Sequence, residues 1–221
     1  MNSPPELRLD WCTHTAARFA VERWHYSQAM PAGKMNAVGV WEHGRYIGCV
    51  LFSRGANNNI GKPYGLDQTQ ICELTRVALT THAAPVSRIL RIAFLFLRKK
   101  SPGLRLCISY ADPEQGHAGG IYQAGNWLYS GKSQPQAQVI VNGQVMHKRS
   151  ATALFGTIKG LEKSPVLWKH RYLLALDAEM RKKIEPLRLP YPRAGGDTQD
   201  TPANHAGEGG SLPTPALHSE P

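Results

Sequence analysis

The residues best suited to chemistry lie together in one segment, residues 109–131, SYADPEQGHAGGIYQAGNWLYSG. Five glycines separate its polar and aromatic side chains. Glycine lets a backbone approach a ligand closely, and Tyr, Asn, Gln and Asp offer donors and acceptors to a polar small molecule or a nucleobase. The segment therefore predicts a binding or catalytic site. Its polar and aromatic members are Ser109, Tyr110, Asp112, His117, Tyr122, Gln123, Asn126, Trp127 and Tyr129.

The elements around this segment predict where it lies. An apolar strand is expected over Leu104–Ser109, so Asp112 is expected just past the carboxyl end of a strand, where α/β proteins tend to build sites. A helix is expected over Pro85–Lys100, because apolar residues recur there at intervals of three and four. Asn142-Gly143 between two β-prone runs predicts a hairpin of Gln138–Val141 with Gln144–His147.

The remaining pattern completes a mixed chain. Further strands are expected over Leu7–Trp11, Ala37–Glu42, Tyr46–Ser53 and Ile71–Leu79, and further helices from Thr13 to about Tyr26 and over Gly119–Ala124. Residues 151–159 and 171–184 are expected to be helical in part, the latter beginning as a strand over 172–176. This order predicts an α/β fold (α+β mixed) with a central mixed, mostly antiparallel sheet and helices on both faces. The acyltransferase fold of the GNAT type has the same order.

The length and composition predict one domain with an appendage. Residues 1–190 are expected to form the domain. Residues 191–221 are rich in Pro, Gly, Ser, Thr and Asp and are expected to be a disordered tail.

The chain is strongly basic, with a net charge of +10 and a pI near 9.6. Residues 1–185 contain 24 of the 26 basic residues and 12 of the 16 acidic residues. This part of the chain therefore carries a net charge of +12. This balance favours an anionic partner, nucleic acid first. The four cysteines lack C-x-x-C spacing, which is typical of reduced thiols in a cytoplasm. No signal-peptide core or membrane-length apolar run is visible, so a cytoplasmic location without a membrane partner is expected.

Residues 111–131 closely resemble the signature of the phage Mom family of DNA adenine modification proteins. Further matching pieces follow in consistent order: WHYSQAMPAGK (24–34), CELTRVAL (72–79), KHRYLLALD (169–177) and LPYPR (189–193). Several pieces in order are much more specific than one motif.

The resemblance implies a transferase with a GNAT-like fold. Mom proteins convert the exocyclic amine of adenine in phage DNA to a carbamoylmethyl (acetamido) group, which shields that DNA from host restriction enzymes. The expected partner is double-stranded DNA with a flipped adenine, in the cytoplasm of the host of a phage or prophage. The resemblance leaves open whether the protein is a homodimer.

The same resemblance carries six family positions onto this chain: His25, Tyr26, Arg76, Ser109, Asp112 and Tyr122. Asp112 could accept a proton from the adenine amine, and Arg76 could bind a phosphate or carbonyl oxygen. Strand alternation is expected to place Leu74 and Arg76 on one face of the sheet and Glu73 and Thr75 on the other.

Supporting roles are expected for the neighbours of these six. Gln123 or Asn126 could pair with the ring edge of the base. Tyr110, Tyr122 or Trp127 could stack on it, or a tyrosine could donate a phenolic proton. Each candidate also has a structural alternative. Asp112 before Pro113 suits a turn, Tyr122 and Trp127 suit a core, His25 could be structural, and Glu73 could form an ion pair with Arg76. His25, His117 and Asp112 could also meet as a two-His-one-carboxylate iron site.

The acyl donor is left open between an acyl-coenzyme A and glycyl-tRNA. The junction over residues 79–87, where GNAT proteins hold the coenzyme pyrophosphate, has no glycine, and Pro85 lacks a backbone donor. A carbamoylmethyl group has the heavy atoms of a glycyl group, which points to glycyl transfer followed by rearrangement. Two other classes remain as alternatives: an N-acetyltransferase for a small molecule or protein, and a non-catalytic basic DNA-binding protein.

Overall fold

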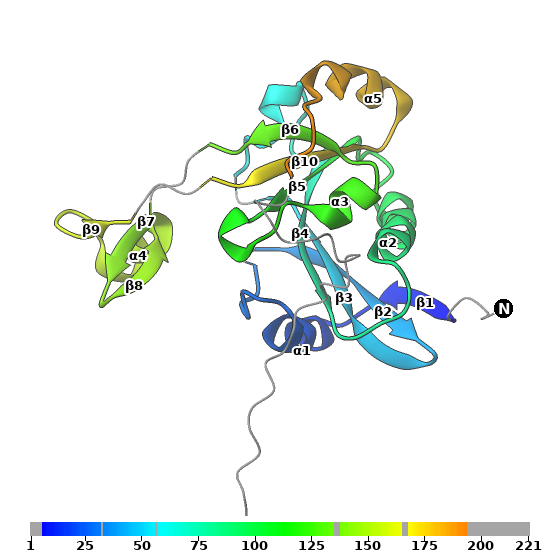
Figure 1. Ribbon diagram of the computed structural model, residues 1–221, viewed down its shortest axis with the longest axis horizontal. Coiled ribbons are helices and arrows are strands. Elements are labelled where there is room, and N and C mark those ends of the chain that lie inside the picture. The colour runs from blue at the N-terminus through cyan, green and yellow to red at the C-terminus, as the bar shows by residue number, and fades with distance from the viewer. Residues whose placement is uncertain (1–5, 32, 56, 135–137, 165–167, 194–221) are drawn as a thin grey trace, which may run out of the picture.

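The computed structural model describes residues 6–193 except 32, 56, 135–137 and 165–167, and it centres on a seven-stranded sheet (Figure 1). All neighbouring strands in the sheet are antiparallel except β4 and β5, which are parallel. In spatial order the strands are β1 (Leu7–Trp11), β2 (Met35–Glu42), β3 (Arg45–Ser53), β4 (Ile71–Leu79), β5 (Leu106–Ala111), β10 (His170–Ala175) and β6 (Leu128–Lys132).

Helices cover both faces of this sheet. On one face, α2 (Val86–Lys100) and α3 (Gly120–Ala124) pack on alternate residues of the central strands, among them Val50, Phe52 and Cys107. On the other face, α1 (His14–Trp24) packs on Cys49 and Leu51, and α5 (Ala178–Ile184) packs on Leu106 and Ile108. Successive strand residues thus bury opposite sides, as a central strand requires. Short 3-10 turns lie at Lys62–Tyr64 (η1), Pro113–Gln115 (η2) and Glu185–Leu187 (η3).

A small second sheet is inserted between β6 and β10. It has the order β8-β7-β9, with β7 at Gln138–Val141, β8 at Gln144–His147 and β9 at Glu162–Lys163, and α4 (Lys148–Phe155) packs against β7 and β8. In Figure 1 this unit stands beside the main sheet. We call residues 138–164 the insert.

The sequence predicted this architecture: the mixed, mostly antiparallel sheet with helices on both faces is confirmed. The Asn-Gly hairpin also forms as predicted. Several details differ from the prediction. The fifth strand begins and ends two residues later than expected. Residues 151–159 are helical in part, as predicted, but α4 begins earlier, at Lys148, and ends at Phe155, because Gly156 leaves it in the left-handed region at φ 71°. The strands β6 and β9 were not predicted at all.

The carboxyl-terminal end of the described chain docks on the main sheet. The amide N–H of Leu189 donates to the carbonyl of Tyr129 at 2.9 Å, and the hydroxyl of Tyr191 donates to the carbonyl of Trp127 at 2.7 Å. The expected tail over 191–221 lies outside the described residues from 194 onward. Of the helices in the described part of the chain, none has the length and apolar run that a membrane crossing requires.

Candidate active site

The parallel strands β4 and β5 pair over only three residues and then separate. Their ladder runs from Ile71 with Leu106 to Glu73 with Ile108, although β4 continues to Leu79. Beyond the last pair, β5 pairs only with β10. The carboxyl ends of β4 and β5 therefore form an opening in the middle of the sheet, the place where parallel strands usually present a site.

Ser109 and Tyr122 meet at this opening. Ser109 is fully buried, and its hydroxyl donates to the carbonyl of Leu74 at 2.7 Å, which links β5 to β4 beyond the ladder. The hydroxyl oxygens of Ser109 and Tyr122 are 2.8 Å apart. Because Ser109 has one proton and the Leu74 carbonyl can only accept, Tyr122 is the donor in this second bond. Burial raises the pKa of Tyr122, although the bond to Ser109 lowers it, so the phenol remains protonated.

His25 ends α1 beside the same opening and is held in one tautomer. Its Nδ1 accepts from the backbone N–H of Ser27 at 3.1 Å, which leaves the proton on Nε2. Burial, followed by the positive charges of Arg76, His117 and Lys169, lowers the pKa of His25 to about 3. The ring is therefore neutral near pH 7 and offers an N–H donor.

Tyr26 lies between the histidines. Its ring centroid is 4.3 Å from that of His25 and 5.3 Å from that of His117, the second contact being edge-on. Tyr26 is also close enough to Tyr122 to raise the pKa of that phenol. Because 47% of Tyr26 is exposed, its ring forms part of the site surface.

Asp112 follows β5 and is fixed by two partners. Its Oδ1 accepts from the N–H of Glu114 at 3.1 Å, and its Oδ2 lies 2.8 Å from Nζ of Lys169. The two side chains of this ion pair are 15% and 37% exposed. The carbonyl of Asp112 also accepts from the N–H of His117 at 3.1 Å. Asp112 is thus both the turn-forming residue and the acidic partner of Lys169.

Arg76 reaches the opening because β4 contains a bulge. The register passes from Phe52 opposite Leu74 to Leu51 opposite Arg76, which leaves Thr75 unpaired. The expected alternation was therefore wrong: Leu74 packs with Phe52 on the α2 face, whereas Arg76 lies opposite Leu51 on the α1 face. A bulge of this kind has no strong local sequence signal.

The Arg76 guanidinium is incompletely bonded. Nη1 donates to the carbonyl of Thr75 at 2.8 Å and Nη2 to that of Ala29 at 3.4 Å. Among the residues that the structure describes, Nε of Arg76 is one of two buried side-chain polar atoms without a hydrogen-bond partner. Buried donors are normally paired, so this one indicates a position for a ligand or water.

Tyr110 and Glu73 lie on the α1 and α5 side of the opening. Burial raises the pKa of Tyr110, and the nearby Glu73 and Tyr64 raise it further. Tyr110 packs with the α5 cluster, on the face opposite Tyr122.

Gln123, Asn126 and Trp127 follow in a turn behind Tyr122. Gln123 donates to the carbonyl of Ala118 at 3.2 Å and to the hydroxyl of Tyr172 at 3.1 Å. Asn126 has φ 56° and makes the left-handed turn after α3. Trp127 is 1% exposed and packs on Tyr122. These contacts shape the wall that supports Tyr122.

Comparison with known proteins assigns the chain to a family. A sequence model of the Mom protein family matches residues 6–193. The chain belongs to the Mom family. It is similar to the methylcarbamoylase Mom of Escherichia phage Mu, with 26% identity over 204 residues that cover 85% of this chain and 84% of that protein. Membership in the Mom family supports a role in phage DNA modification.

Solved structures with some similarity to this Mom protein are acyl-transferring enzymes. The N-acyl amino acid synthase FeeM from uncultured soil microbes has 11% identity and a TM-score of 0.46, with 81% of this chain and 94% of that chain covered. The spermidine/spermine N-acetyltransferase SpeG of Vibrio cholerae has 12% identity and a TM-score of 0.42, with 81% and 96% covered.

The coenzyme cradle expected in a GNAT-like fold is closed in this Mom protein. The backbone N–H groups of Ala83 and Ala84, just before α2, donate to the two carboxylate oxygens of Glu42 at 2.8 Å each. Glu42 is 8% exposed. Two of the amides ahead of α2 therefore already hold an internal anion, and Pro85 has no N–H to add. This arrangement disfavours a coenzyme A pyrophosphate at the start of α2.

The residues considered for iron do not form a metal site either. Within the described residues, no group of three His, Cys, Asp or Glu side chains is arranged to hold a metal ion. Nδ1 of His25 is occupied by Ser27, and Asp112 is paired with Lys169.

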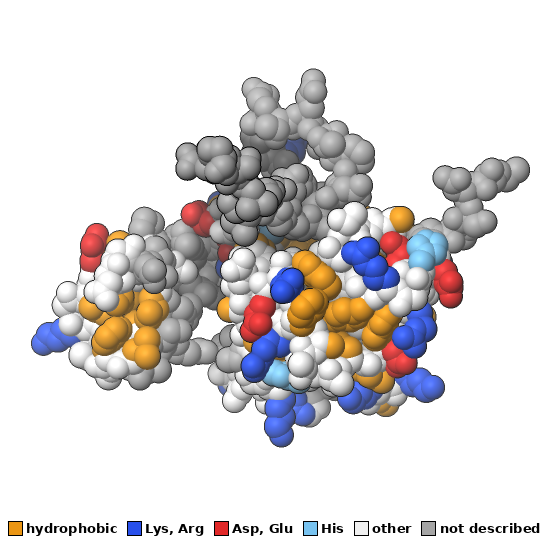
Figure 2. All heavy atoms as spheres, turned by 90° about the horizontal axis from the view of Figure 1, so that it is seen from below, with side chains coloured by type: hydrophobic (Ala, Val, Ile, Leu, Met, Phe, Trp, Pro, Cys, Tyr) orange, Lys and Arg blue, Asp and Glu red, His pale blue; other side chains and the backbone are white. Residues whose placement is uncertain are grey.

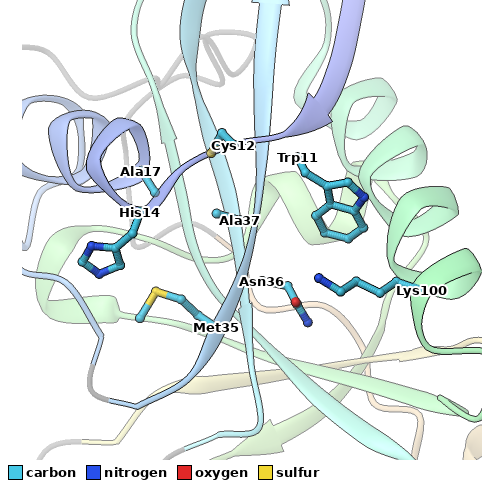
Figure 3. Close-up of a pocket in the computed structure, with 8 residues that line it drawn as sticks. All are labelled: Trp11, Cys12, His14, Ala17, Met35, Asn36, Ala37 and Lys100. Atoms are coloured by element: carbon cyan, nitrogen blue, oxygen red, sulfur yellow. The ribbon is translucent and has the colours of Figure 1, made fainter.

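Two hollows in the described surface lie away from the opening. The smaller, about 160 Å³, is drawn in Figure 3, with Trp11 and Lys100 on one side and His14 and Met35 on the other. The larger, about 700 Å³, lies near the amino end of β4 and contains Arg54. Neither is lined by any of the six positions carried over from the family.

The structure adds two residues that the sequence reasoning had not selected, Lys169 and Glu42. Lys169 stood inside a family-like piece, KHRYLLALD, which was the available signal. No sequence pattern pointed to Glu42, because its hydrogen-bond partners lie about forty residues further along the chain.

Proposed function

We propose that this Mom protein converts the exocyclic amine of adenine in phage DNA to a carbamoylmethyl group. One observation supports the proposal above the rest. The six positions carried over from the family, which are spread between residues 25 and 122, lie around the separated ends of β4 and β5. They are His25, Tyr26, Arg76, Ser109, Asp112 and Tyr122.

Asp112 is the proposed base. The adenine amine is a weak nucleophile inside the duplex, so the base must be flipped out before it reacts. The Asp112 carboxylate then accepts the amine proton as nitrogen attacks the donor carbonyl. The ion pair with Lys169 holds the carboxylate in position. The exposed ring of Tyr26 offers the flipped base a surface for stacking.

Arg76 is the proposed binder of the donor's acyl oxygen. Its unpaired Nε is a charged donor beside the opening, and such donors stabilise an oxygen that becomes negative in acyl transfer. The Nε2 proton of neutral His25 is a second donor in the same cluster. Ser109 and Tyr122 are buried and hydrogen-bonded to each other. We therefore propose that they hold the ends of β4 and β5 in position.

Glycyl-tRNA is the proposed donor. The adenine amine attacks the glycyl ester carbonyl, the Asp112 carboxylate takes one amine proton, and the tRNA hydroxyl leaves with a proton. The new glycyl amine then attacks the ring carbon that bears the amide. Expulsion of the amide nitrogen from that carbon leaves the purine bonded to NH-CH2-CO-NH2. The second step is an isomerisation and needs no oxidant or metal, and the closed coenzyme cradle at Glu42 favours a donor other than coenzyme A.

The test uses bacteria that express the full chain. Their DNA is digested to nucleosides, and mass spectrometry looks for an adenosine that carries a carbamoylmethyl group in place of one hydrogen. Isotopically labelled glycine should label that group. An unlabelled product would refute the glycyl route but leave the modification intact, whereas the absence of any modified adenosine would refute the proposed function.

Asp112→Asn tests the base. The amide keeps an oxygen for the Glu114 N–H but removes the charge that pairs with Lys169, so the turn should persist while the product is lost. The neighbouring variant Glu114→Gln is the matched control and should retain the product. Full retention of product by Asp112→Asn would remove Asp112 from the mechanism.

A further inference from the structure

The insert is a folded unit rather than a loose loop. Its three short strands and α4 bury their own small core, in which Val139 is 2% exposed and Ala151 is fully buried. The seven-stranded sheet is complete without it, because β6 and β10 pair with each other directly. Sheet formation therefore does not explain why the chain leaves the domain and returns.

The chain that builds the insert and its base is strongly basic. Residues 132–171 contain seven Lys and Arg and a single acidic residue, Glu162, which is a net charge of +6 in a chain of +10. Lys148, Lys159 and Lys163 have exposed side chains. A local excess of this size attracts a polyanion and makes binding depend on salt.

The base of the insert adjoins the candidate site. We call Lys132, Ser133, Trp168 and Lys169 the neck. The N–H of Ser133 donates to the carbonyl of Lys169 at 2.7 Å, and the N–H of Lys169 donates to Oγ of Ser133 at 2.9 Å. Nζ of Lys132 lies 3.8 Å from the ring centroid of Trp168. Through its ion pair with Asp112, Lys169 joins the neck to the proposed base.

The insert also exposes large apolar side chains. Leu154 is 66% exposed and Phe155 is 52% exposed, at the carboxyl end of α4. Figure 2 shows hydrophobic side chains gathered on the visible face of the insert. Apolar residues next to exposed lysines are typical of proteins that contact both the backbone and the interior of a DNA groove.

We infer that the insert and its neck form the arm that binds duplex DNA beside the Asp112 site. This inference rests on the proposed function. Base flipping requires the flanking duplex to be held while one nucleotide is extruded, and phosphate contacts supply that hold. The basic arm that begins at Lys169 is placed to make these contacts, and it leads directly to the carboxylate that would meet the flipped base.

The test is a salt titration with the full chain. The triple variant Lys148→Gln, Lys159→Gln, Lys163→Gln removes three exposed charges of the insert. The control variant Lys62→Gln, Lys99→Gln, Lys182→Gln removes three exposed lysines of the main domain and matches it in charge. Affinity for a fluorescent duplex is measured by anisotropy between about 50 and 200 mM salt. The slope of log affinity against log salt should fall by roughly one for each lysine that no longer binds a phosphate, so by about two to three in the insert variant.

The possible outcomes distinguish a failure of the DNA-binding arm from a failure of the proposed function. The arm is supported when the insert variant binds duplex more weakly than the control, with the shallower slope, and yields less modified adenine in cells. Equal affinity and slope for both variants would overturn the arm. A loss of tRNA binding with duplex binding unchanged would also overturn it, because the arm would then bind the donor. A wild-type chain that binds duplex through the insert but yields no modified adenine would refute the proposed function alone.

Discussion

The carboxylate of Glu42 at the start of α2 offers a quantitative test of the closed cradle. Glu42→Ala removes the acceptor of two backbone N–H groups, each bonded at 2.8 Å. Ala84 is fully buried, so its N–H loses its partner without access to water, whereas Ala83 is exposed. The substitution also removes a negative charge from the amino end of α2, where the helix dipole favours it.

These losses give the expected magnitude. An unsatisfied buried N–H costs about 1–3 kcal/mol, a partly solvated one less, and the charge–dipole loss adds about 0.3–1 kcal/mol. Glu42→Ala should therefore destabilise the fold by about 2–4 kcal/mol. For a domain of this size each kcal/mol lowers Tm by about 2–4 °C, so the loss should be roughly 5–15 °C. Glu42→Gln keeps one acceptor oxygen and should lose about half as much.

The measurement is urea and thermal unfolding of the full chain followed by circular dichroism. Glu22→Ala, on the exposed side of α1, is the control and should change stability by less than about 0.5 kcal/mol. Acetyl-coenzyme A should leave the Tm of the wild type unchanged. The reasoning is refuted if Glu42→Ala unfolds at the same urea concentration as the control, or if the wild type is stabilised by the coenzyme.

Three further outcomes are expected. Ser109→Ala should cost about 2–3 kcal/mol of stability and Tyr122→Phe about 1 kcal/mol, since only the first leaves both partners of Ser109 unbonded; the reverse order in urea unfolding would contradict the donor assignment. The pKa of His25 is lowered to about 3 from 6.5, so the unfolded chain binds the proton first, and stability should fall as pH drops from 6.5 towards 3 by up to about 1.4 kcal/mol per pH unit. His25→Gln should flatten that profile, and an unchanged slope would argue against the lowered pKa. Asp177 caps α5, because its Oδ1 accepts from the N–H of Met180 at 2.7 Å. Asp177→Ala should therefore lower the free energy of unfolding by about 1–2 kcal/mol in the same assay. No change would mean that α5 does not depend on its cap.

Local sequence signals predicted most elements of this fold. The amphipathic spacing of α2 and the Asn-Gly turn between β7 and β8 act within a few residues, so the sequence displays them directly. The strand β6 was missed for the opposite reason. Its residues, LYSGK, have no strand pattern of their own, and they are extended because they pair with β10, about forty residues away.

The candidate site could likewise be predicted from the sequence only in part. Its polar segment could be recognised from composition, because glycines and polar aromatics stand together after a strand. The ion pair of Lys169 with Asp112, and the bulge that turns Arg76 to the α1 face, depend on how distant strands align. Neither leaves a mark in the spacing of nearby residues.

The paired backbone at Ser133 and Lys169 makes the insert separable in evolutionary terms. Since the chain leaves and returns at hydrogen-bonded neighbours, residues can be added, exchanged or shortened between them while β6 and β10 remain one hairpin. The fold therefore permits one peripheral segment to change without rebuilding the main sheet. The residues around the opening of the sheet, which would carry the chemistry, need not change with it.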